Sequence, residues 1–188
     1  YDPQRDLAPI SRLVVTPNVL VVGVDTESRN FSDWLAWLRL QPPGRISYAS
    51  AGVGTSSHRA GELLAKMTGV EMTHVPSNQS PLPDVVAGRV DLLFANIATA
   101  MPLVREGRLR AFAVSSLQRT SIAPELPTLA ESGLPGFEAT AWFAMLAPAA
   151  TPPEMLARWQ RAARTALATP AVRAKLQSLG IEAVGGSP

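Results

Sequence analysis

The stretch that decides the fold runs from Tyr48 to Met67 and reads YASAGVGTSSHRAGELLAKM. The apolar segment 45–49 that leads into it predicts a short strand. Gly52 and Gly54 follow at once, and two glycines so close together allow the backbone to turn sharply. The hydroxyl side chains after them are typical of a helix N-cap. The predicted order is therefore strand, glycine turn and helix.

The predicted helix has one apolar face and two clear ends. Thr55, Ser56 and Ser57 offer the N-cap hydroxyls, and Gly69 supplies a stop. Its apolar residues are spaced at i, i+3, i+4 and i+7, so they share one stripe: Ala60, Leu63, Leu64 and Met67. A helix of this kind packs on a sheet with its N-terminus at the sheet edge.

The start of this helix is a candidate anion site. Four unpaired N–H groups and the positive end of the helix dipole converge there, which suits a carboxylate or a phosphate. The alternative is a capped helix start that binds nothing. The segment is not a P-loop, because no Lys follows the second glycine of the turn, and it does not meet the GxGxxG spacing of a dinucleotide site.

Composition places the chain among ordinary globular proteins. It has 188 residues, 46% hydrophobic and 17% charged, which suits one or two domains with a sizeable core. A net charge of +2 without Lys/Arg blocks argues against a nucleic-acid partner. Cysteine is absent, which excludes disulfides and thiolate chemistry. We recognise neither a membrane span nor a signal peptide, and we expect a fragment or a processed form.

The rest of the chain repeats the strand–helix pattern, which predicts an α/β fold of parallel character. Pro17-Asn18 interrupts two apolar runs and is typical of a crossing between lobes. The predicted strands are 10–16, 19–24, 45–49, 70–75, 90–94, 109–114 and 140–147. The predicted helices follow Ser32, Thr55, Thr128, Thr151 and Thr169 or cover 84–87 and 101–105, with T-x-x-E capping boxes at Thr128 and Thr151.

Several apolar side chains are expected to face a core. Trp34, Leu35 and Leu38 form the inward side of the helix after Ser32. Trp142 and Phe143 belong either to a buried strand or to an apolar cleft wall. The two C-terminal helices carry inward stripes made of Met155, Leu156, Trp159, Ala163, Val172, Leu176 and Leu179.

Three polar segments directly follow predicted strands. They are residues 50–57, 76–80 and 96–99. Ligands of open α/β sheets bind outside the carboxyl ends of the strands, at a point where the strand order reverses. We therefore expect these segments to share one rim.

The two histidines, His58 and His74, invite a catalytic or metal-binding interpretation. His58 follows Ser57, but adjacent helix residues point about 100° apart and cannot form a nucleophile–base pair. We expect His58 to face solvent or the cleft without chemistry, and His74 to be a hydrogen-bonded structural residue. Two isolated histidines without other ligands at suitable spacing predict no metal site, and nothing predicts a cofactor.

Six groups of segments, spread over nearly the whole chain, resemble a single protein family. They are YDPQRDLAPISRLVVTPNVLVV, SYASAGVGTSSHRAGELL, THVP with GRVDLLFAN, GRLRAFAV, PELPTLAESGLPGFEATAWFAMLAPAATPPE and TPAVRAKLQSLG. In this order and spacing the chain resembles the periplasmic solute receptors of tripartite tricarboxylate transporters, also called Bug receptors.

The resemblance implies a periplasmic binding protein-like fold of type II, whose two lobes close on a small organic carboxylate and deliver it to membrane transporter subunits. This chain would be one complete lobe plus part of the other. Residues 1–17 would be a remnant of lobe 1 with the crossing strand, 18–138 the ligand-binding lobe 2, and 139–188 the return strand and C-terminal helices of lobe 1. The family's first β-α unit would lie upstream of Tyr1, so we expect a truncated chain with an orphaned sheet edge that favours self-association.

The resemblance also assigns a ligand site. Its contacts are mainly backbone N–H groups, hydroxyls and bridging waters, in agreement with the anion site at the helix start. This chain departs from the family's usual residues at Ser77-Asn78-Gln79 and at Ala95, which changes the polar lining. Carried over position by position, the ligand-facing residues are Ser50, Ala51, Gly52, Gly54, Thr55, Ser56 and Asn96.

Three functions follow from these patterns. The leading hypothesis is a periplasmic receptor without catalysis. The alternative is the effector-sensing domain of a transcription regulator, which shares the two-lobe plan and requires a DNA-binding motif on the same gene product, whereas the receptor requires a secretory signal upstream. A hydrolase is third, and it requires a base and an orienting acid around Ser56 or Ser57.

Overall fold

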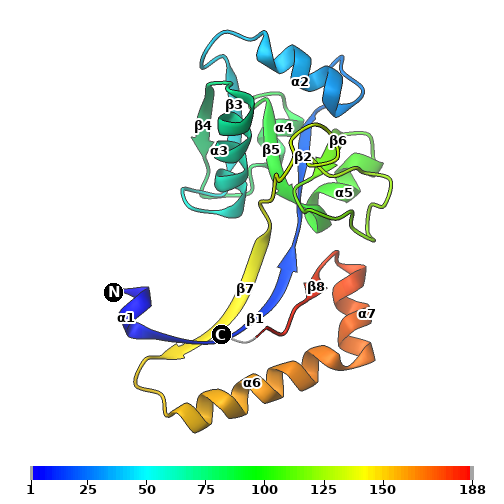
Figure 1. Ribbon diagram of the computed structural model, residues 1–188. Coiled ribbons are helices and arrows are strands. Elements are labelled where there is room, and N and C mark those ends of the chain that lie inside the picture. Colours follow the sequence, from blue (N-terminus) through cyan, green and yellow to red (C-terminus); the bar gives the residue numbers. More distant parts are fainter. Residues whose placement is uncertain (1, 187–188) are drawn as a thin grey trace. The chain divides into compact units, whose positions relative to one another are not determined.

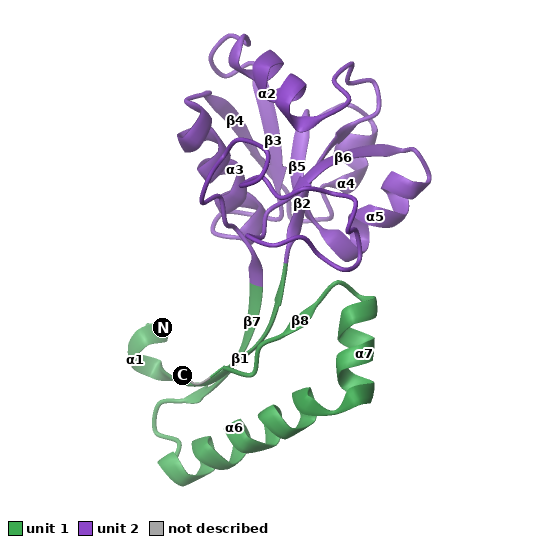
Figure 2. Ribbon diagram, turned by 45° about the vertical axis from the view of Figure 1, so that its right-hand side comes forward, with its two compact units in different colours: residues 1–16, 142–188 green, residues 17–141 purple. Residues whose placement is uncertain are grey.

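The computed structural model describes residues 2–186 and divides into two compact units (Figures 1 and 2). Unit 1 joins the described residues up to Thr16 with those from Trp142 onward, and unit 2 is the continuous segment Pro17–Ala141. Unit 2 contains β2 (Asn18–Gly23), α2 (Phe31–Arg39), β3 (Ile46–Ser50), α3 (Ser56–Thr68), β4 (Met72–Pro76), α4 (Leu82–Val86), β5 (Leu92–Asn96), α5 (Ile97–Arg105) and β6 (Leu109–Val114). Unit 1 contains α1 (Pro3–Asp6), β1 (Leu7–Thr16), β7 (Ala141–Pro148, which begins at the last residue of unit 2), α6 (Pro153–Ala168), α7 (Pro170–Ser178) and β8 (Glu182–Ala183).

The sheet of unit 2 has the strand order β4-β3-β5-β2-β6. β3 pairs parallel with β4 and β5, as the strand–helix pattern predicts. β2 is the exception, because it pairs antiparallel with both β5 and β6. It enters the sheet directly after β1, without a crossover helix that would return the chain to a parallel direction. β5 and β6 therefore run the same way, with β2 reversed between them.

Each face of this sheet carries its own apolar core. α2 and α3 cover one face, where Trp34, Leu64 and Phe94 are buried together. α4 and α5 cover the other face, where Val85, Leu93 and Ile97 are buried. The predicted stripe of α3 is confirmed: Ala60 and Leu64 are buried, and Leu63 and Met67 pack against the same core. The inward side of α2, Trp34, Leu35 and Leu38, is confirmed as well.

Two helix starts in unit 2 differ from the sequence prediction. α2 is capped by Asn30, whose Oδ1 accepts the Asp33 N–H at 2.9 Å, so the prediction of Ser32 as the cap was wrong. An Asn two residues earlier offers an equally good acceptor, and the helix takes it. α5 begins at Ile97 instead of Met101, because Asn96 caps it through a bond from the Ala98 N–H to Oδ1 at 3.0 Å.

The segment after Thr128 makes the predicted capping contacts without forming a helix. Thr128 and Glu131 exchange side chain–backbone bonds, each of 3.0 Å. The chain nevertheless continues as turns, because the Leu129 N–H donates to the Val114 carbonyl at 3.0 Å and Thr128 forms a β-bridge with Val114. The prediction of a short helix that ends at Gly133 was therefore wrong, because this backbone pairs with the end of β6.

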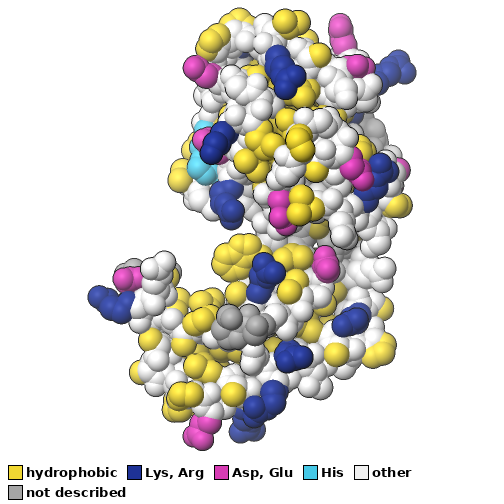
Figure 3. Space-filling view, in the orientation of Figure 1, with side chains coloured by type: hydrophobic (Ala, Val, Ile, Leu, Met, Phe, Trp, Pro, Cys, Tyr) yellow, Lys and Arg dark blue, Asp and Glu magenta, His cyan; other side chains and the backbone are white. Residues whose placement is uncertain are grey.

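Unit 1 has a three-stranded sheet of order β7-β1-β8 together with the short α1 and the longer α6 and α7. Neither α6 nor α7 has a buried residue, so the predicted inward stripes are not buried within the described chain. Trp142 and Phe143 are 54% and 56% exposed, and hydrophobic side chains lie at the surface of this unit (Figure 3). The stripes remain amphipathic, but no further layer of described residues covers them.

The start of α6 also corrects a prediction. Proline occupies the first helical position at Pro153, as predicted, but the N-cap is Pro152 and no side chain caps the helix. Thr151 lies one residue too early for a capping box. Within the described residues, none of the helices is both long and apolar enough to span a membrane.

Candidate functional site

The strand order of unit 2 reverses between β3 and β5. From β3 the chain crosses through α3 to β4 at one edge of the sheet, whereas from β5 it crosses through α5 to β6 on the other side. α3 and α5 lie on opposite faces. The carboxyl ends of β3, β4 and β5 are neighbours, so the three predicted segments share one rim, and this is the place where open α/β sheets bind ligands.

The turn between β3 and α3 depends on its two glycines. Gly52 and Gly54 have φ angles of +116° and +84°, which other residues adopt only under strain. A Cβ at either position would have no heavy atom within 4 Å. The glycines are therefore required by backbone conformation and not by lack of space.

Hydroxyl side chains tie this turn to the helix. Thr55 is the N-cap of α3: its Oγ1 accepts the His58 N–H at 3.4 Å and donates to the Gly52 carbonyl at 2.7 Å. The Ser57 hydroxyl accepts the Ala51 N–H at 3.2 Å. The predicted strand, glycine turn and capped helix are thus confirmed, and side chains from both ends hold the turn in one conformation.

Most amides of the turn already donate inside it. Ala51 donates to Ser57, Gly52 to the Ser50 hydroxyl at 3.1 Å, and Gly54 to a ring nitrogen of His58 at 3.2 Å. In the described structure no partner is assigned to the amides of Ser56 and Ser57 or to the Ser56 hydroxyl. These groups are the donors that the turn can offer to an anion without breaking a bond of its own.

Asn96 lies at the end of β5, next to β3. Its Oδ1 caps α5 and its carbonyl accepts the Thr99 hydroxyl at 2.9 Å, so the side chain fixes a second helix start at the same rim. The segment after β4 is also bound to this rim, because the Ser77 N–H donates to the Ser50 carbonyl at 2.9 Å. Two helix N-termini thus converge on one edge of the sheet.

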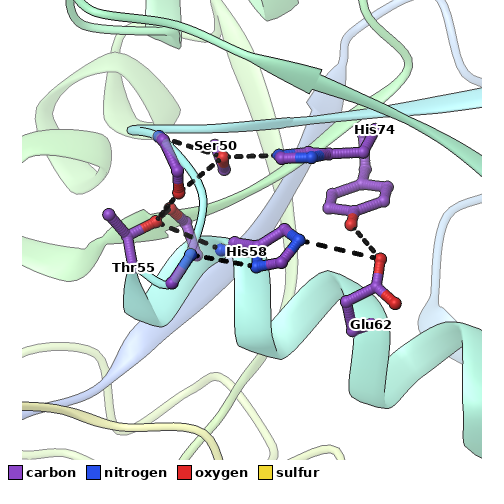
Figure 4. Close-up of polar contacts among 9 residues, drawn as sticks. Ser50, Thr55, His58, Glu62 and His74 are labelled. Carbon is purple, nitrogen blue, oxygen red and sulfur yellow. Dashed lines mark hydrogen bonds and ion pairs between the residues drawn. The ribbon is translucent and has the colours of Figure 1, made fainter.

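Beside the turn lies a cluster of titratable side chains that sequence analysis did not bring together (Figure 4). His74 on β4 bonds through Nε2 to the Ser50 hydroxyl at 2.7 Å. Its ring stacks on Tyr48 with centroids 4.8 Å apart, and lies 4.3 Å from the ring of His58 on α3. Tyr48 donates a hydrogen bond to the Glu62 carboxylate, and Glu62 lies 3.9 Å from His58 Nε2. The imidazole rings reach the surface of unit 2, shown in cyan in Figure 3.

Burial and charge shift two groups of this cluster. Burial, together with the Glu62 hydrogen bond and charge, raises the pKa of the Tyr48 phenol, which therefore stays protonated. Burial and then the neighbouring His58 lower the pKa of His74, while Glu62 acts in the opposite direction. The cluster consequently favours a neutral His74.

We expect the free energy of unfolding to decrease as the pH falls below about 6.5, the ordinary imidazole value. The unfolded chain then binds a proton at His74, whereas the folded protein binds it only at a lower pH. Urea unfolding of wild type and His74→Gln at several pH values measures this effect. The wild type should lose stability relative to the variant between about pH 6.5 and the lowered pKa. An equal pH dependence of both proteins would contradict it.

His58, which was expected to face solvent or the cleft without chemistry, makes contacts that this expectation did not include. Its side chain is only 20% exposed, and its Nδ1 accepts the Gly54 N–H. His74 is the hydrogen-bonded structural residue that was predicted. The signal that could have revealed the cluster is Gly61, a glycine inside a helical pattern, because such a glycine often marks close packing. A Cβ at Gly61 would lie 2.3 Å from the Tyr48 ring.

The cluster does not have the arrangement of a hydrolase. Ser57 bonds to Ala51 and Thr55, not to a histidine. Ser50 does bond to His74, but the residue is fully buried, so a substrate cannot reach its hydroxyl. In residues 2–186, no group of three or more His, Cys, Asp or Glu side chains is placed to hold a metal ion.

Comparisons with known proteins agree with this geometry. The model of the tripartite tricarboxylate transporter family receptor matches residues 1–188. A UPF0065 protein from the tcbD-tcbE intergenic region of Pseudomonas sp. strain P51 is 41% identical over 191 residues, covering 100% of this chain and 56% of its own length. This chain thus spans little more than half of that relative.

Two solved structures share the fold and carry small carboxylates. R. palustris Rpa4515 with adipate is 34% identical with a TM-score of 0.90, covering 100% of this chain and 63% of its own. MatC (Rpa3494) from Rhodopseudomonas palustris with bound malate is 31% identical with a TM-score of 0.83, covering 96% and 62%. The α/β, periplasmic binding protein-like fold predicted from the sequence is confirmed. The chain belongs to the receptor family of the tripartite tricarboxylate transporters.

Proposed function

We propose that this protein is a periplasmic receptor that captures a small organic carboxylate at the rim of β3 and β5 and delivers it to a tripartite tricarboxylate-type membrane transporter. The observation that carries the proposal is the convergence of the α3 and α5 N-termini at the point where the strand order reverses. Family membership and the adipate and malate bound by related structures support the ligand class.

The ligand carboxylate accepts hydrogen bonds from the amides of Ser56 and Ser57 and from the Ser56 hydroxyl. These donors are unoccupied in the described structure, and the α3 dipole favours a negative charge beside them. Asn96 keeps the start of α5 at the same rim. The remaining predicted ligand residues act through the shape of the turn or through bridging waters. They are Ser50, Ala51, Gly52, Gly54 and Thr55.

Capture follows a shift between open and closed states of a two-lobed protein. A ligand that contacts both lobes only in the closed state favours that state by its difference in affinity. Capture of this kind needs no catalytic group, and family membership is the ground for inferring a receptor without enzymatic activity. Membrane transporter subunits are then the partners that receive the ligand.

Replacing Ser56 with leucine is expected to weaken carboxylate binding about tenfold or more, which corresponds to the loss of one charge-assisted hydrogen bond. Titration calorimetry of the complete gene product with adipate, malate and other mono-, di- and tricarboxylates measures the effect. Ser32→Leu is the matched control, because Ser32 is an exposed serine in the first turn of α2. Its affinity should equal that of the wild type.

The same titrations test the whole proposal when the 188-residue chain is run in parallel. Binding of one acid per complete chain, with weaker binding by the shorter chain, is the expected result for a two-lobed receptor. Equal affinity of Ser56→Leu and wild type would remove this turn from the site. Absence of binding by the complete gene product to every acid would refute the carboxylate receptor.

A further inference from the structure

Both histidines of the chain bond to the glycine turn, although they come from different elements. The His58 ring on α3 accepts the Gly54 N–H at Nδ1, with 3.2 Å between the nitrogens. The His74 ring on β4 bonds to the Ser50 hydroxyl at 2.7 Å, and that hydroxyl accepts the Gly52 N–H at 3.1 Å. Imidazole nitrogens therefore hold two amides of the turn, one directly and one through a hydroxyl.

The Gly54 contact determines the protonation state of His58. A ring nitrogen that accepts an N–H carries no proton, so this His58 is neutral and has its proton on Nε2. An imidazolium would direct a second N–H from Nδ1 at the Gly54 N–H. The hydrogen bond would then be replaced by the repulsion of two donors, and Gly54 would be released.

The two rings also affect one another. Their centroids are 4.3 Å apart with an angle of 41° between the planes, so a charge on one ring disfavours a charge on the other. Tyr48 on β3 covers the His74 ring with a neutral phenol. Glu62 on α3 faces the pair as well, and its carboxylate attracts a proton to the rings. The Glu62 carboxylate thus favours a protonated His74, whereas burial and the neighbouring His58 ring favour a neutral one.

We propose that His58 and His74 are positioning residues for the turn 50–55, and that the turn holds a carboxylate at full affinity only while the His58 ring is neutral, because only a neutral ring accepts the Gly54 N–H. This inference rests on the proposed function, because it concerns the same turn. It adds that acidification loosens Gly54 and so weakens ligand binding. Rings with a purely structural role would give the binding affinity no such pH dependence.

The test is titration calorimetry with adipate between about pH 8 and about pH 5.5, the range in which histidines change charge. The wild-type affinity should fall about tenfold on acidification, the equivalent of about one lost hydrogen bond. The double variant His58→Asn, His74→Gln places amide oxygens or nitrogens where the ring nitrogens lie, and these do not titrate. Compared with its own affinity at high pH, the double variant should not show the fall that is expected of the wild type. Ionisation of adipate affects the binding of both proteins equally.

A rescue comparison separates positioning from packing. His58→Leu removes the acceptor for Gly54, whereas His58→Asn keeps an oxygen at the Nδ1 position. The Asn variant should bind adipate more tightly than the Leu variant at high pH. Equal affinity of these two variants would overturn the role of the Gly54 bond. A wild-type affinity that stays constant or rises on acidification relative to the double variant would overturn the requirement for a neutral His58 ring.

Nitrogen NMR without ligand gives an independent readout. The Gly54 amide signal should titrate with the same midpoint as His58 Nδ1, because the two nitrogens share one hydrogen bond. A Gly54 signal that does not follow the ring would overturn the positioning role. If adipate and the other acids bind at no pH, the proposed function fails, whereas this titration still decides whether the histidines position the turn.

Discussion

Replacing Trp34 with alanine is expected to lower the free energy of unfolding of unit 2 by about 3–5 kcal/mol, the usual cost of deleting a buried aromatic side chain. Trp34 on α2 is 2% exposed. Its ring lies 5.9 Å from that of Phe31 and 5.5 Å from that of Phe112 on β6, measured between centroids. The substitution leaves a cavity between the helix and the sheet that the surrounding rings cannot fill.

The same helix supplies the control for this prediction. Trp37 is 41% exposed, and Trp37→Ala should cost less than about 1 kcal/mol, since exposed substitutions have small effects. Urea unfolding followed by circular dichroism compares both variants with the wild type. Similar losses for Trp34→Ala and Trp37→Ala would show that α2 does not pack on the sheet in this way.

Replacing Gly61 with alanine should destabilise the protein by about 1–3 kcal/mol, although alanine normally favours a helix over glycine by about 1 kcal/mol. The new Cβ would lie 2.3 Å from the ring of Tyr48, which is 1% exposed and bonded to Glu62. The ring can move away only by giving up its stacking on His74. Overpacking therefore outweighs helix propensity at this position.

A double-mutant cycle with Tyr48→Val isolates this contact. Once the ring is removed, Gly61→Ala should become neutral or stabilise the protein by up to about 1 kcal/mol. Lys66→Ala, an exposed change in the same helix, should have an effect within about 0.5 kcal/mol. The same destabilisation by Gly61→Ala in both backgrounds would mean that the clash with Tyr48 is not its cause.

Local features of this protein were predictable because short segments determine them. Thr55 caps α3, Gly69 ends it with a positive φ of +74°, and Gly52 allows the turn, each for reasons that lie within a few residues. The rim of the candidate site followed from the same rule, since the ends of neighbouring parallel strands must meet. Family resemblance supplied the overall fold and the proposed ligand class.

Contacts between distant segments could not be predicted from the sequence. The pair of His58 and His74 depends on the register that places Tyr48 opposite His74 in the β3–β4 pairing, and no local pattern fixes a register. The reversed direction of β2 likewise has no signal within its own sequence. For α6, the apolar stripe around Trp159 was visible, but periodicity alone does not tell whether another layer covers it.

The position of β2 has a consequence for synthesis of the protein. Its apolar residues are made before those of β5 and β6, yet Val19 has its sheet partners at Ala95 and Val114. Until both arrive, the run Val19–Val22, fully buried in the final fold, is an unpaired strand with two open edges. Such a segment pairs readily with other chains. The exposure of this run to other chains therefore ends only when β6 has been made.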